Sequence, residues 1–199
     1  MLPALAVAES LNARGVHVTF AGSPDRVEAR LVPEAGYELD TFQISGLPRK
    51  PTPALLKALY RAGRAPVACR KILRSRRPDV VLGGGGFVAG PMVLAASTMR
   101  IPAALSEADA HLGLANRLAI PYARRVFLAY PTTARSRKKY LVVGRPIPAR
   151  SRPLPQSEGR EIFGLPEDEP VLAVFGALAG ARALNELVVE AFGAVGPAV

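Results

Sequence analysis

The sequence is poor in the residues that carry metal and covalent chemistry. Cys69 is the only cysteine among 199 residues, and His17 and His111 are the only histidines. A single cysteine excludes an intrachain disulfide and a cysteine-rich metal cluster, and we find no metal-ligand spacing in the sequence. Cys69 lies among apolar neighbours, which predicts a small buried side chain. We therefore expect no bound metal and no cofactor.

Long apolar runs and targeting patterns are also missing. No apolar stretch approaches the length that spans a bilayer, and the chain opens Met1-Leu2-Pro3 without the basic region of a secretory signal. The Gly-x-Ser-x-Gly pattern of serine hydrolases does not occur either. These absences favour a cytoplasmic protein that does not work through a serine nucleophile.

Acidic residues are absent from one long interval. Between Thr41 and Pro78 there is no Asp or Glu, but there are ten Lys or Arg, which equals the net charge of +10. Such a concentration of positive charge indicates an anionic partner: lipid headgroups, nucleic acid or a phosphorylated substrate. Tyr60 is the only aromatic residue between Arg49 and Arg77, so bases would stack poorly and nucleic acid is disfavoured.

Apolar residues make up 49% of the chain and occur in short runs separated by glycine and proline. Strand and helix patterns alternate, which predicts an α/β fold with a Rossmann-like parallel sheet and helices on both faces. The expected strands are 16–20, 37–44, 79–83, 101–105, 126–129, 140–143 and 171–175. The expected helices are 3–14, 24–33, 53–63, 66–76, the glycine loop to about 99, 113–119 and 182–192, with a break at 63–66.

The most informative stretch is Asp79–Pro91. A β-branched run ends in four consecutive glycines, 83–86, and apolar Phe87 opens the following helix. Glycines let the main chain approach a ligand and aim several N–H groups at one point, and the helix start adds its positive end. The pattern predicts an anion or diphosphate cradle, with a plain tight turn as the alternative.

Several phrases, in order along the whole chain, resemble the MurG family of bacterial N-acetylglucosaminyltransferases, which convert lipid I to lipid II in peptidoglycan synthesis. The phrases are Pro3–Ala8, Ile44–Leu47, Pro78–Gly83 with Gly90-Pro91, Gly113–Leu118, Val142–Gly144 with Pro146, and Gly180–Arg182 with Leu184-Asn185. Jointly they are specific, whereas each alone is weak.

The resemblance implies a GT-B architecture of two Rossmann-like domains. Residues 1–146 would form the acceptor-binding N-terminal domain, 147–160 a linker rich in Pro, Ser and Arg, and 161–199 the first β-α unit of an incomplete donor-binding domain. The family's first glycine loop would lie before Met1, so we expect the true start of the protein upstream.

The resemblance also implies an activity. An inverting, metal-free transferase would move N-acetylglucosamine from UDP-GlcNAc to undecaprenyl-diphospho-N-acetylmuramoyl-pentapeptide (lipid I), as a peripheral protein on the cytoplasmic face of the cell membrane. We expect this fragment alone to be inactive. The alternatives are a non-catalytic module that binds anionic phospholipid, from a degenerate or truncated gene, and a related glycolipid glycosyltransferase.

By resemblance, Gly83, Gly84, Gly85, Gly86 and Phe87 hold the acceptor diphosphate. Glu107 and Asp109 follow a strand, where ligands bind in parallel sheets, and are substrate contacts and candidate bases; helix capping is the alternative role. Asn116 is a substrate contact or a surface amide. The family's His-Glu-Gln-Asn is here Ser106–Asp109, and its Gly-Asn-Pro-Val-Arg is Gly144–Pro148. The donor-loop remnant has lost its serine and comprises Gly176, Leu178, Gly180 and Ala181.

A helix over 53–63 is expected to face the membrane. Leu55, Leu56 and Leu59 share one helical face, with Tyr60 beside them and Lys57 and Arg61 flanking. A cationic, apolar helix suits an anionic leaflet. The alternative is a helix that packs on the core with a solvated basic edge.

Overall fold

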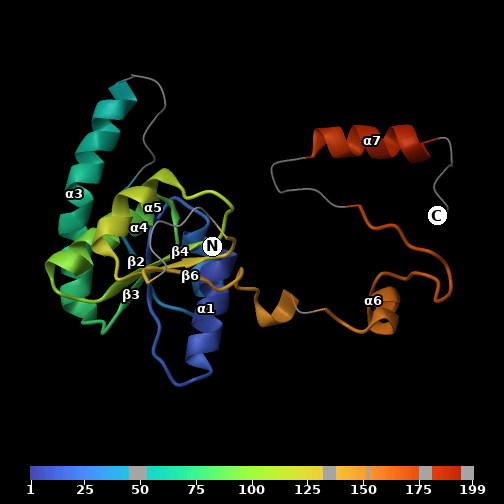
Figure 1. Ribbon diagram of the computed structural model, residues 1–199, viewed down its shortest axis with the longest axis horizontal. Helices are drawn as coiled ribbons and strands as arrows, with labels where there is room; N and C mark the ends of the chain where they lie inside the picture. Colours follow the sequence, from blue (N-terminus) through green and yellow to red (C-terminus); the bar gives the residue numbers. More distant parts are fainter. Residues whose placement is uncertain (45–52, 132–137, 152, 175–180, 194–199) are drawn as a thin grey trace. The chain divides into compact units, whose positions relative to one another are not determined.

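The computed structural model describes residues 1–44, 53–131, 138–151, 153–174 and 181–193, but not the side chains of 53–62 and 150. The chain divides into two compact units, Met1–Arg152 and Pro153–Val199, and the division lies inside the interval 147–160. Figure 1 shows the first unit as layered helices and strands. Each unit is described by itself below.

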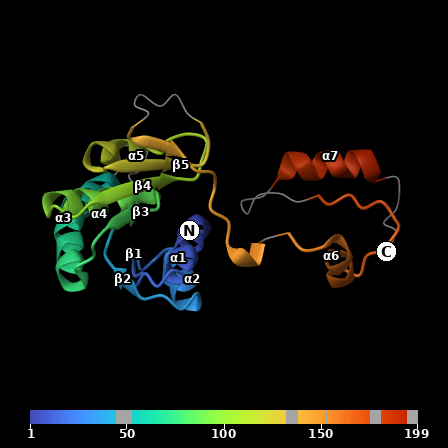
Figure 2. The same cartoon turned by 60° about the horizontal axis from the view of Figure 1, so that its bottom comes forward.

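The first unit contains two parallel sheets (Figure 2). One sheet pairs β1 with β2, and the other has the order β3-β4-β5-β6, with every pair parallel. The strands are β1 Phe20–Gly22, β2 Leu39–Thr41, β3 Val81–Gly83, β4 Ala103–Glu107, β5 Arg125–Leu128 and β6 Tyr140–Val142. The predicted α/β class with parallel strands is confirmed.

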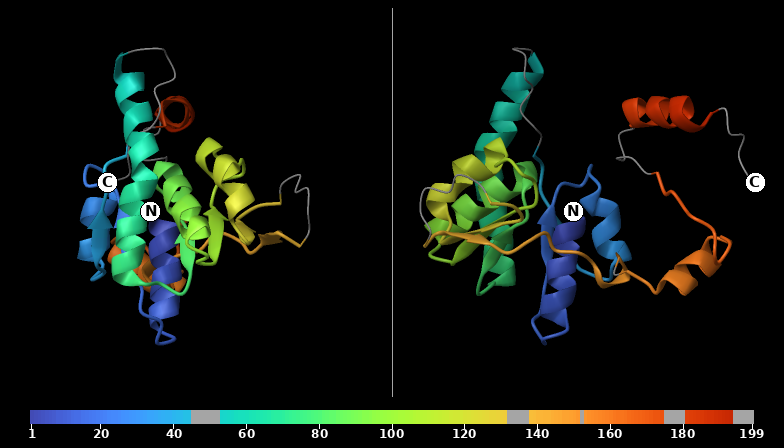
Figure 3. Two further views of the ribbon diagram at one scale, coloured as in Figure 1. Left: turned by 90° about the vertical axis from the view of Figure 1, so that its left-hand side faces the viewer. Right: turned by 45° about the vertical axis from the view of Figure 1, so that its right-hand side comes forward.

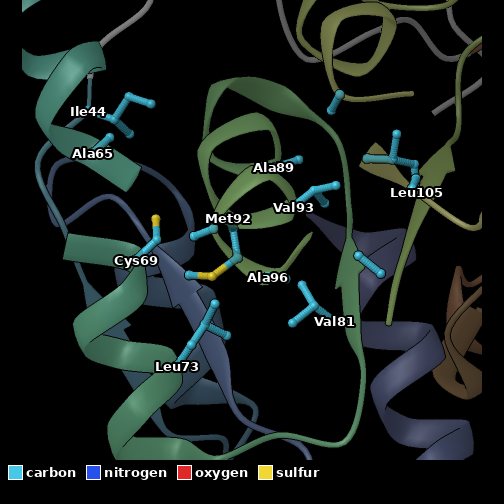
Figure 4. Packing of buried hydrophobic residues seen from close by; sticks show 14 of the residues in the cluster. Ile44, Ala65, Cys69, Leu73, Val81, Ala89, Met92, Val93, Ala96 and Leu105 are labelled. Carbon is cyan, nitrogen blue, oxygen red and sulfur yellow. The ribbon is translucent and has the colours of Figure 1, made fainter. Parts of the chain in front are cut away.

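Helices separate the strands of the first unit, as β-α alternation requires. They are α1 Leu2–Asn12, α2 Glu28–Glu34, α3 Pro53–Arg76, α4 Gly86–Thr98 and α5 Leu114–Ala119, with short 3₁₀ turns at Ile120–Tyr122 and Ala149–Ser151. The core lies between α3, α4 and the four-stranded sheet (Figure 4). Ala65, Cys69 and Leu73 recur every four residues along α3, so they share the face that packs toward Met92 of α4.

The predicted break at 63–66 is wrong, because α3 runs as one helix from Pro53 to Arg76. Pro66 removes one backbone donor, and Gly63 lowers helix propensity. Packing outweighs both effects, since Ala65 is 2% and Cys69 0% exposed beneath α4. Tertiary contact therefore holds together a helix that local propensity would divide.

The first two strands are shorter than the sequence predicts. Alternation suggests a strand over 16–20, but β1 begins only at Phe20, and β2 covers three residues of the expected 37–44. Helix α2 begins at Glu28 instead of Pro24. The Ser23 N–H donates to Oε1 of Glu28 at 3.2 Å, so a turn precedes the helix.

The second unit holds α6 Gln156–Ile162 and α7 Arg182–Phe192. Helix α7 matches its prediction, and α6 falls inside the expected linker. The predicted strand at 171–175 does not form over 171–174, and Phe175 lies outside the described residues. A strand needs a partner for its backbone groups, and the described part of this unit contains none. No side chain described in this unit is buried.

Candidate functional site

The carboxyl edge of the larger sheet gathers the predicted site residues of the first unit. Strand β3 ends at Gly83 and β4 at Glu107, and the two strands are parallel neighbours. A Cβ placed on Gly85 would lie 3.8 Å from Nδ2 of Asn116 and 3.8 Å from the carbonyl oxygen of Ser106. The glycine loop therefore lies directly against the Glu107–Asn116 region, at the edge where open parallel sheets bind ligands.

The glycines of the loop have two different roles. Gly83 is buried, and a Cβ there would lie 2.8 Å from Cδ2 of Leu105, so packing alone requires glycine. Gly85 and Gly86 have φ values of +92° and +70°, which L side chains rarely adopt. Gly84, Gly86 and Phe87 are exposed, so this part of the loop is open to solvent.

The open part of the loop is also the start of α4. Gly85 is the N-cap, no side chain caps the helix, and its first turn contains no acid. The first N–H groups of a helix have no partner within it, and the helix dipole makes this end positive. A Cβ on Gly86 would meet nothing within 4 Å. The geometry can therefore accept an anion on main-chain donors.

Glu107 is buried and fully engaged by neighbouring donors. It is 7% exposed and accepts hydrogen bonds from the N–H of Asp109 at 3.3 Å, the N–H of Gly113 at 2.9 Å and Nδ2 of Asn116 at 2.9 Å. These bonds fold the loop 108–113 back onto β4 and hold the start of α5. Its carboxylate orients this edge of the sheet and does not face solvent.

Asn116 is 2% exposed, so the surface-amide alternative is wrong. Its Nδ2 also donates to the carbonyl oxygen of Ser106 at 3.3 Å, and the bond to Glu107 fixes the orientation of the amide, because an ionised carboxylate only accepts. Its Oδ1 is buried without a hydrogen-bond partner among the described residues. Asp109 and His111 are exposed beside this pair.

Part of the basic segment is neutralised in space by acids from outside the segment. Arg76 binds both oxygens of Asp40 through Nε at 2.7 Å and Nη2 at 3.1 Å, and Nη1 donates to Glu38. Hydrogen bonds from Arg76 to Asp40 and then to Glu38 raise the pKa of the guanidinium further. Exposed Lys71, Arg74 and Arg77 form no ion pair within the described part of the chain. Because acids from outside the segment pair with Arg76, the net charge of the segment overstates its unpaired positive charge.

Two groups of predicted site residues lie wholly or partly outside the residues and side chains that the structure describes. The side chains of the proposed membrane-facing set are not described, although the backbone there belongs to α3. Of the donor-loop remnant only Ala181 is described, as the N-cap of α7. Within the described ranges, no helix is both long and apolar enough to cross a membrane. The same residues contain no group of three or more His, Cys, Asp or Glu placed to hold a metal ion.

Sequence analysis missed three partners at the site and in the basic segment. Ser106 contributes a carbonyl oxygen and Gly113 an N–H, and main-chain roles leave little trace in side-chain patterns. Asp40, the partner of Arg76, lies 36 residues earlier in the chain. Gly113 before an apolar helix was an available signal, since glycine is accepted at N-caps.

The sequence pattern of the glycosyltransferase family 28 N-terminal domain matches residues 1–128. The chain belongs to glycosyltransferase family 28. The match covers both sheets up to β5, and with them the glycine loop, Glu107 and Asn116.

Curated relatives match nearly the whole chain. A protein of Halothermothrix orenii is 37% identical over 96% of this chain, and one of Acidithiobacillus ferrooxidans is 44% identical over 93%. Both are named UDP-N-acetylglucosamine–N-acetylmuramyl-(pentapeptide) pyrophosphoryl-undecaprenol N-acetylglucosamine transferase. The chain spans about half the length of these relatives, 53% and 50%.

A solved family structure shows the same fold. Acinetobacter baumannii MurG is 27% identical, with a TM-score of 0.61 over 79% of this chain and 43% of that protein. The predicted resemblance to the MurG family and its GT-B fold is thereby confirmed.

Proposed function

We propose that this chain is the acceptor-binding part of an N-acetylglucosaminyltransferase. Its acceptor is undecaprenyl-diphospho-N-acetylmuramoyl-pentapeptide, its donor is UDP-GlcNAc, and its product belongs to peptidoglycan synthesis. The names of the relatives support the substrate pair. The open glycine loop supports the assignment of acceptor binding to this part of the protein. Its geometry can accept an anion, and it lies within the residues that match the family 28 domain.

The observation that carries this proposal is the exposure of Gly84 and Gly86 at the uncapped start of α4. A diphosphate carries negative charge on several oxygens, which suits a cluster of main-chain N–H groups at a positive helix end. With no Cβ on either residue, the ligand can approach the backbone. Exposed Phe87 would contact the apolar part of the same ligand.

The carboxylates of Glu107 and Asp109 would have different roles in the transfer reaction at this edge of the sheet. Transfer requires that the acceptor hydroxyl lose a proton while the leaving diphosphate is stabilised. Asp109 is exposed and has no side-chain hydrogen bond among the described residues, so it is free to contact substrate. Glu107 accepts three hydrogen bonds and acts through Asn116 and the loop, as a positioning residue.

Membrane contact is part of the same proposal. Lys71, Arg74 and Arg77 are exposed on and just after α3, and a surface of this charge is attracted to anionic phospholipid. The protein would then act as a peripheral protein on the cytoplasmic face, where its lipid-linked acceptor is anchored. Vesicle sedimentation should show binding to anionic but not to neutral vesicles, and equal binding to both would contradict this part.

Binding of a water-soluble, short-chain prenyl-diphospho-N-acetylmuramoyl-pentapeptide tests the glycine loop. Gly86→Ala should weaken binding at least about tenfold, because one charge-assisted contact is worth more than about 1.4 kcal/mol. Gly36→Ala is the matched control, since Gly36 has φ +80° and open space around it, like Gly86 with φ +70°. Inorganic pyrophosphate should compete with the ligand.

Equal affinity for both variants would overturn the proposed diphosphate site.

We expect no sugar transfer by this chain alone, because the described part of Pro153–Val199 buries no side chain that could shape a nucleotide site. Turnover of radiolabelled UDP-GlcNAc by the chain would contradict that expectation. Vesicle binding without any ligand binding would favour a non-catalytic lipid-binding module.

A further inference from the structure

One buried amide connects the two parts of the candidate site, the glycine loop and the loop 108–113. Asn116 of α5 lies against the glycine loop, because a Cβ on Gly85 would be 3.8 Å from its Nδ2. The same Nδ2 donates to Oε2 of Glu107 at 2.9 Å and to the carbonyl oxygen of Ser106 at 3.3 Å. Asn116 therefore contacts both the start of α4 and the end of β4, from which the loop 108–113 leaves the sheet.

Helices α4 and α5 pack directly on each other beside this amide. A Cβ on Gly90, one turn into α4, would lie 3.8 Å from the carbonyl oxygen of Ala115, so the two backbones approach closely here. In both views of Figure 3 the yellow-green α5 lies beside the green α4. Close packing transmits small shifts, since a protein interior has few voids that absorb them. A shift of the main chain at Gly85 would therefore reach α5.

The main chain of the glycine loop is able to shift when an anion binds. Gly85 and Gly86 have no side chain that anchors them, and their positive φ values are accessible to glycine at little cost. A bound diphosphate attracts the N–H groups at the start of α4, which have no partner within the helix. Asn116 has an atom that responds to such a shift, because its Oδ1 is buried and accepts no hydrogen bond from the described residues. A loop arrangement that supplies a donor to Oδ1 is favoured, since an unpaired buried acceptor is costly.

Asn116 also controls the loop 108–113, through Glu107. That carboxylate accepts the N–H of Asp109 at 3.3 Å and the N–H of Gly113 at 2.9 Å, and so holds both ends of the loop. The orientation of the carboxylate decides where the loop lies, and the bond from Asn116 fixes that orientation. The position of Asp109, the exposed candidate base, therefore depends on the buried amide.

We propose that Asn116 is a positioning residue that couples the two parts of the site. Binding of an anion at the glycine loop tightens the loop 108–113 through this amide, and thereby places Asp109 for the reaction. The inference deepens the proposed function and rests on it, because the anion is the diphosphate of the acceptor. A base that is placed only after the acceptor binds would not activate water against the donor in the absence of the acceptor.

Hydrogen exchange of the unaltered chain, with and without inorganic pyrophosphate, tests the coupling. We expect the amides of Asp109 and Gly113 to exchange at least about fivefold more slowly at saturating pyrophosphate, which is the lower end of typical coupling between two sites. The amide of Gly36 is the control and should not change, since it is bonded to the carbonyl oxygen of Pro33 in the turn after α2. Titration calorimetry measures the binding of pyrophosphate independently of the exchange.

Substitutions separate the role of Asn116 from the packing around it. Asn116→Ala should abolish the slowing and weaken pyrophosphate binding about fivefold, because coupling between two sites is reciprocal. Glu107→Gln keeps the size of the side chain and should reduce the slowing, since one amide oxygen replaces two carboxylate oxygens. Asn12→Ala, at the exposed end of α1, is the matched control and should retain both effects. If neither site variant folds, exchange in the unaltered chain decides.

Pyrophosphate that binds without slowing the exchange of Asp109 and Gly113 would overturn this inference and leave the proposed diphosphate site intact. Equal slowing at Gly36 would also overturn it, because the ligand would then stabilise the whole unit. Slowing that persists in Asn116→Ala would assign the coupling to the packing of α4 on α5 and remove the role of the amide. If pyrophosphate does not bind at all, both the inference and the proposed function fail.

Discussion

Asn116 donates a hydrogen bond from Nδ2 to Oε2 of Glu107 at 2.9 Å, with both side chains at least nine-tenths buried. The pair joins α5 to the end of β4, directly beneath Gly85. Replacing this amide by a second acceptor removes the bond and places two acceptors against each other in a buried place, although Glu107 keeps the N–H groups of Asp109 and Gly113. The stability of this edge should therefore depend on the identity of residue 116.

Asn116→Asp should lower the free energy of unfolding at pH 7 by about 2–4 kcal/mol, because two carboxylates would face each other in a buried place. Urea unfolding followed by circular dichroism measures the change. Asn12→Asp is the control at the exposed carboxyl end of α1, where a negative charge costs about 0.3–1 kcal/mol. Equal losses for the two variants would show that the Asn116 bond contributes nothing.

Gly83→Ala should destabilise the protein by about 1–3 kcal/mol through overpacking. Its Cβ would approach Cδ2 of Leu105 to 2.8 Å and the side chains of Ala89 and Val93 to 3.1 Å. Adding Leu105→Val should recover part of the loss, which a double-mutant cycle in urea detects. Gly63→Ala is a control of opposite sign, because nothing lies within 4 Å of its Cβ and alanine favours a helix by about 0.5–1 kcal/mol. A loss in the double variant equal to the sum of both single losses would contradict the clash.

Pro66→Ala should stabilise the protein by about 1–3 kcal/mol, because alanine restores the missing donor in the interior of α3. Pro53→Ala is the matched control, since proline is well accepted at the first helical position. The thermal midpoint of each variant distinguishes one continuous helix from two helices that meet at 63–66. If two helices met at 63–66, as local propensity suggests, Pro66 would start the second one and its replacement would give no gain.

Cys69 should react slowly with a disulfide reagent in the native protein. Burial raises the pKa of its thiol to about 12. At pH 8 the thiolate fraction is then about a thousandfold below that of an ordinary thiol. Val67→Cys in a Cys69→Ala background places a thiol at an exposed position of the same helix and should react at once. Fast native labelling of Cys69 would contradict its burial.

The same shift predicts how stability depends on pH. Because folding raises this pKa, the neutral thiol is favoured in the folded state, and its contribution is complete below the unfolded value near 9. Stability should fall as pH rises from about 9 toward 12, since only the unfolded chain releases the proton there. Cys69→Ala should remove this part of the slope in urea titrations at alkaline pH. An unchanged slope would assign it to other groups.

The sequence was sufficient for features that depend on local pattern. Helix α4 after four glycines and the β-α order follow from apolar runs and glycine positions, and both are as predicted. Features that depend on distant partners were not accessible. Arg76 and Asp40 are far apart in the chain, the unbroken α3 depends on packing against α4, and a strand over 171–174 would need a neighbour that the described residues do not supply.

The candidate site likewise has one part that the sequence predicts and one part that it does not. The glycine loop was visible because glycine runs are rare signals with a direct backbone meaning. The roles of Glu107 and Asn116 were not separable from sequence, since a carboxylate and an amide after a strand suit either substrate contact or internal bonding. Only their burial and shared hydrogen bond show that they hold each other.

The uneven burial of the two units has a calorimetric consequence. Every buried apolar side chain in the described residues belongs to Met1–Arg152, whereas Leu187, Val189 and Phe192 of α7 remain largely in water. The heat-capacity increment of melting comes from newly hydrated apolar surface, at about 12–15 cal/mol/K per residue that takes part. A scanning experiment should therefore give the increment of a protein of roughly three-quarters of this chain's mass, since the described side chains of Pro153–Val199 are already hydrated before the transition begins.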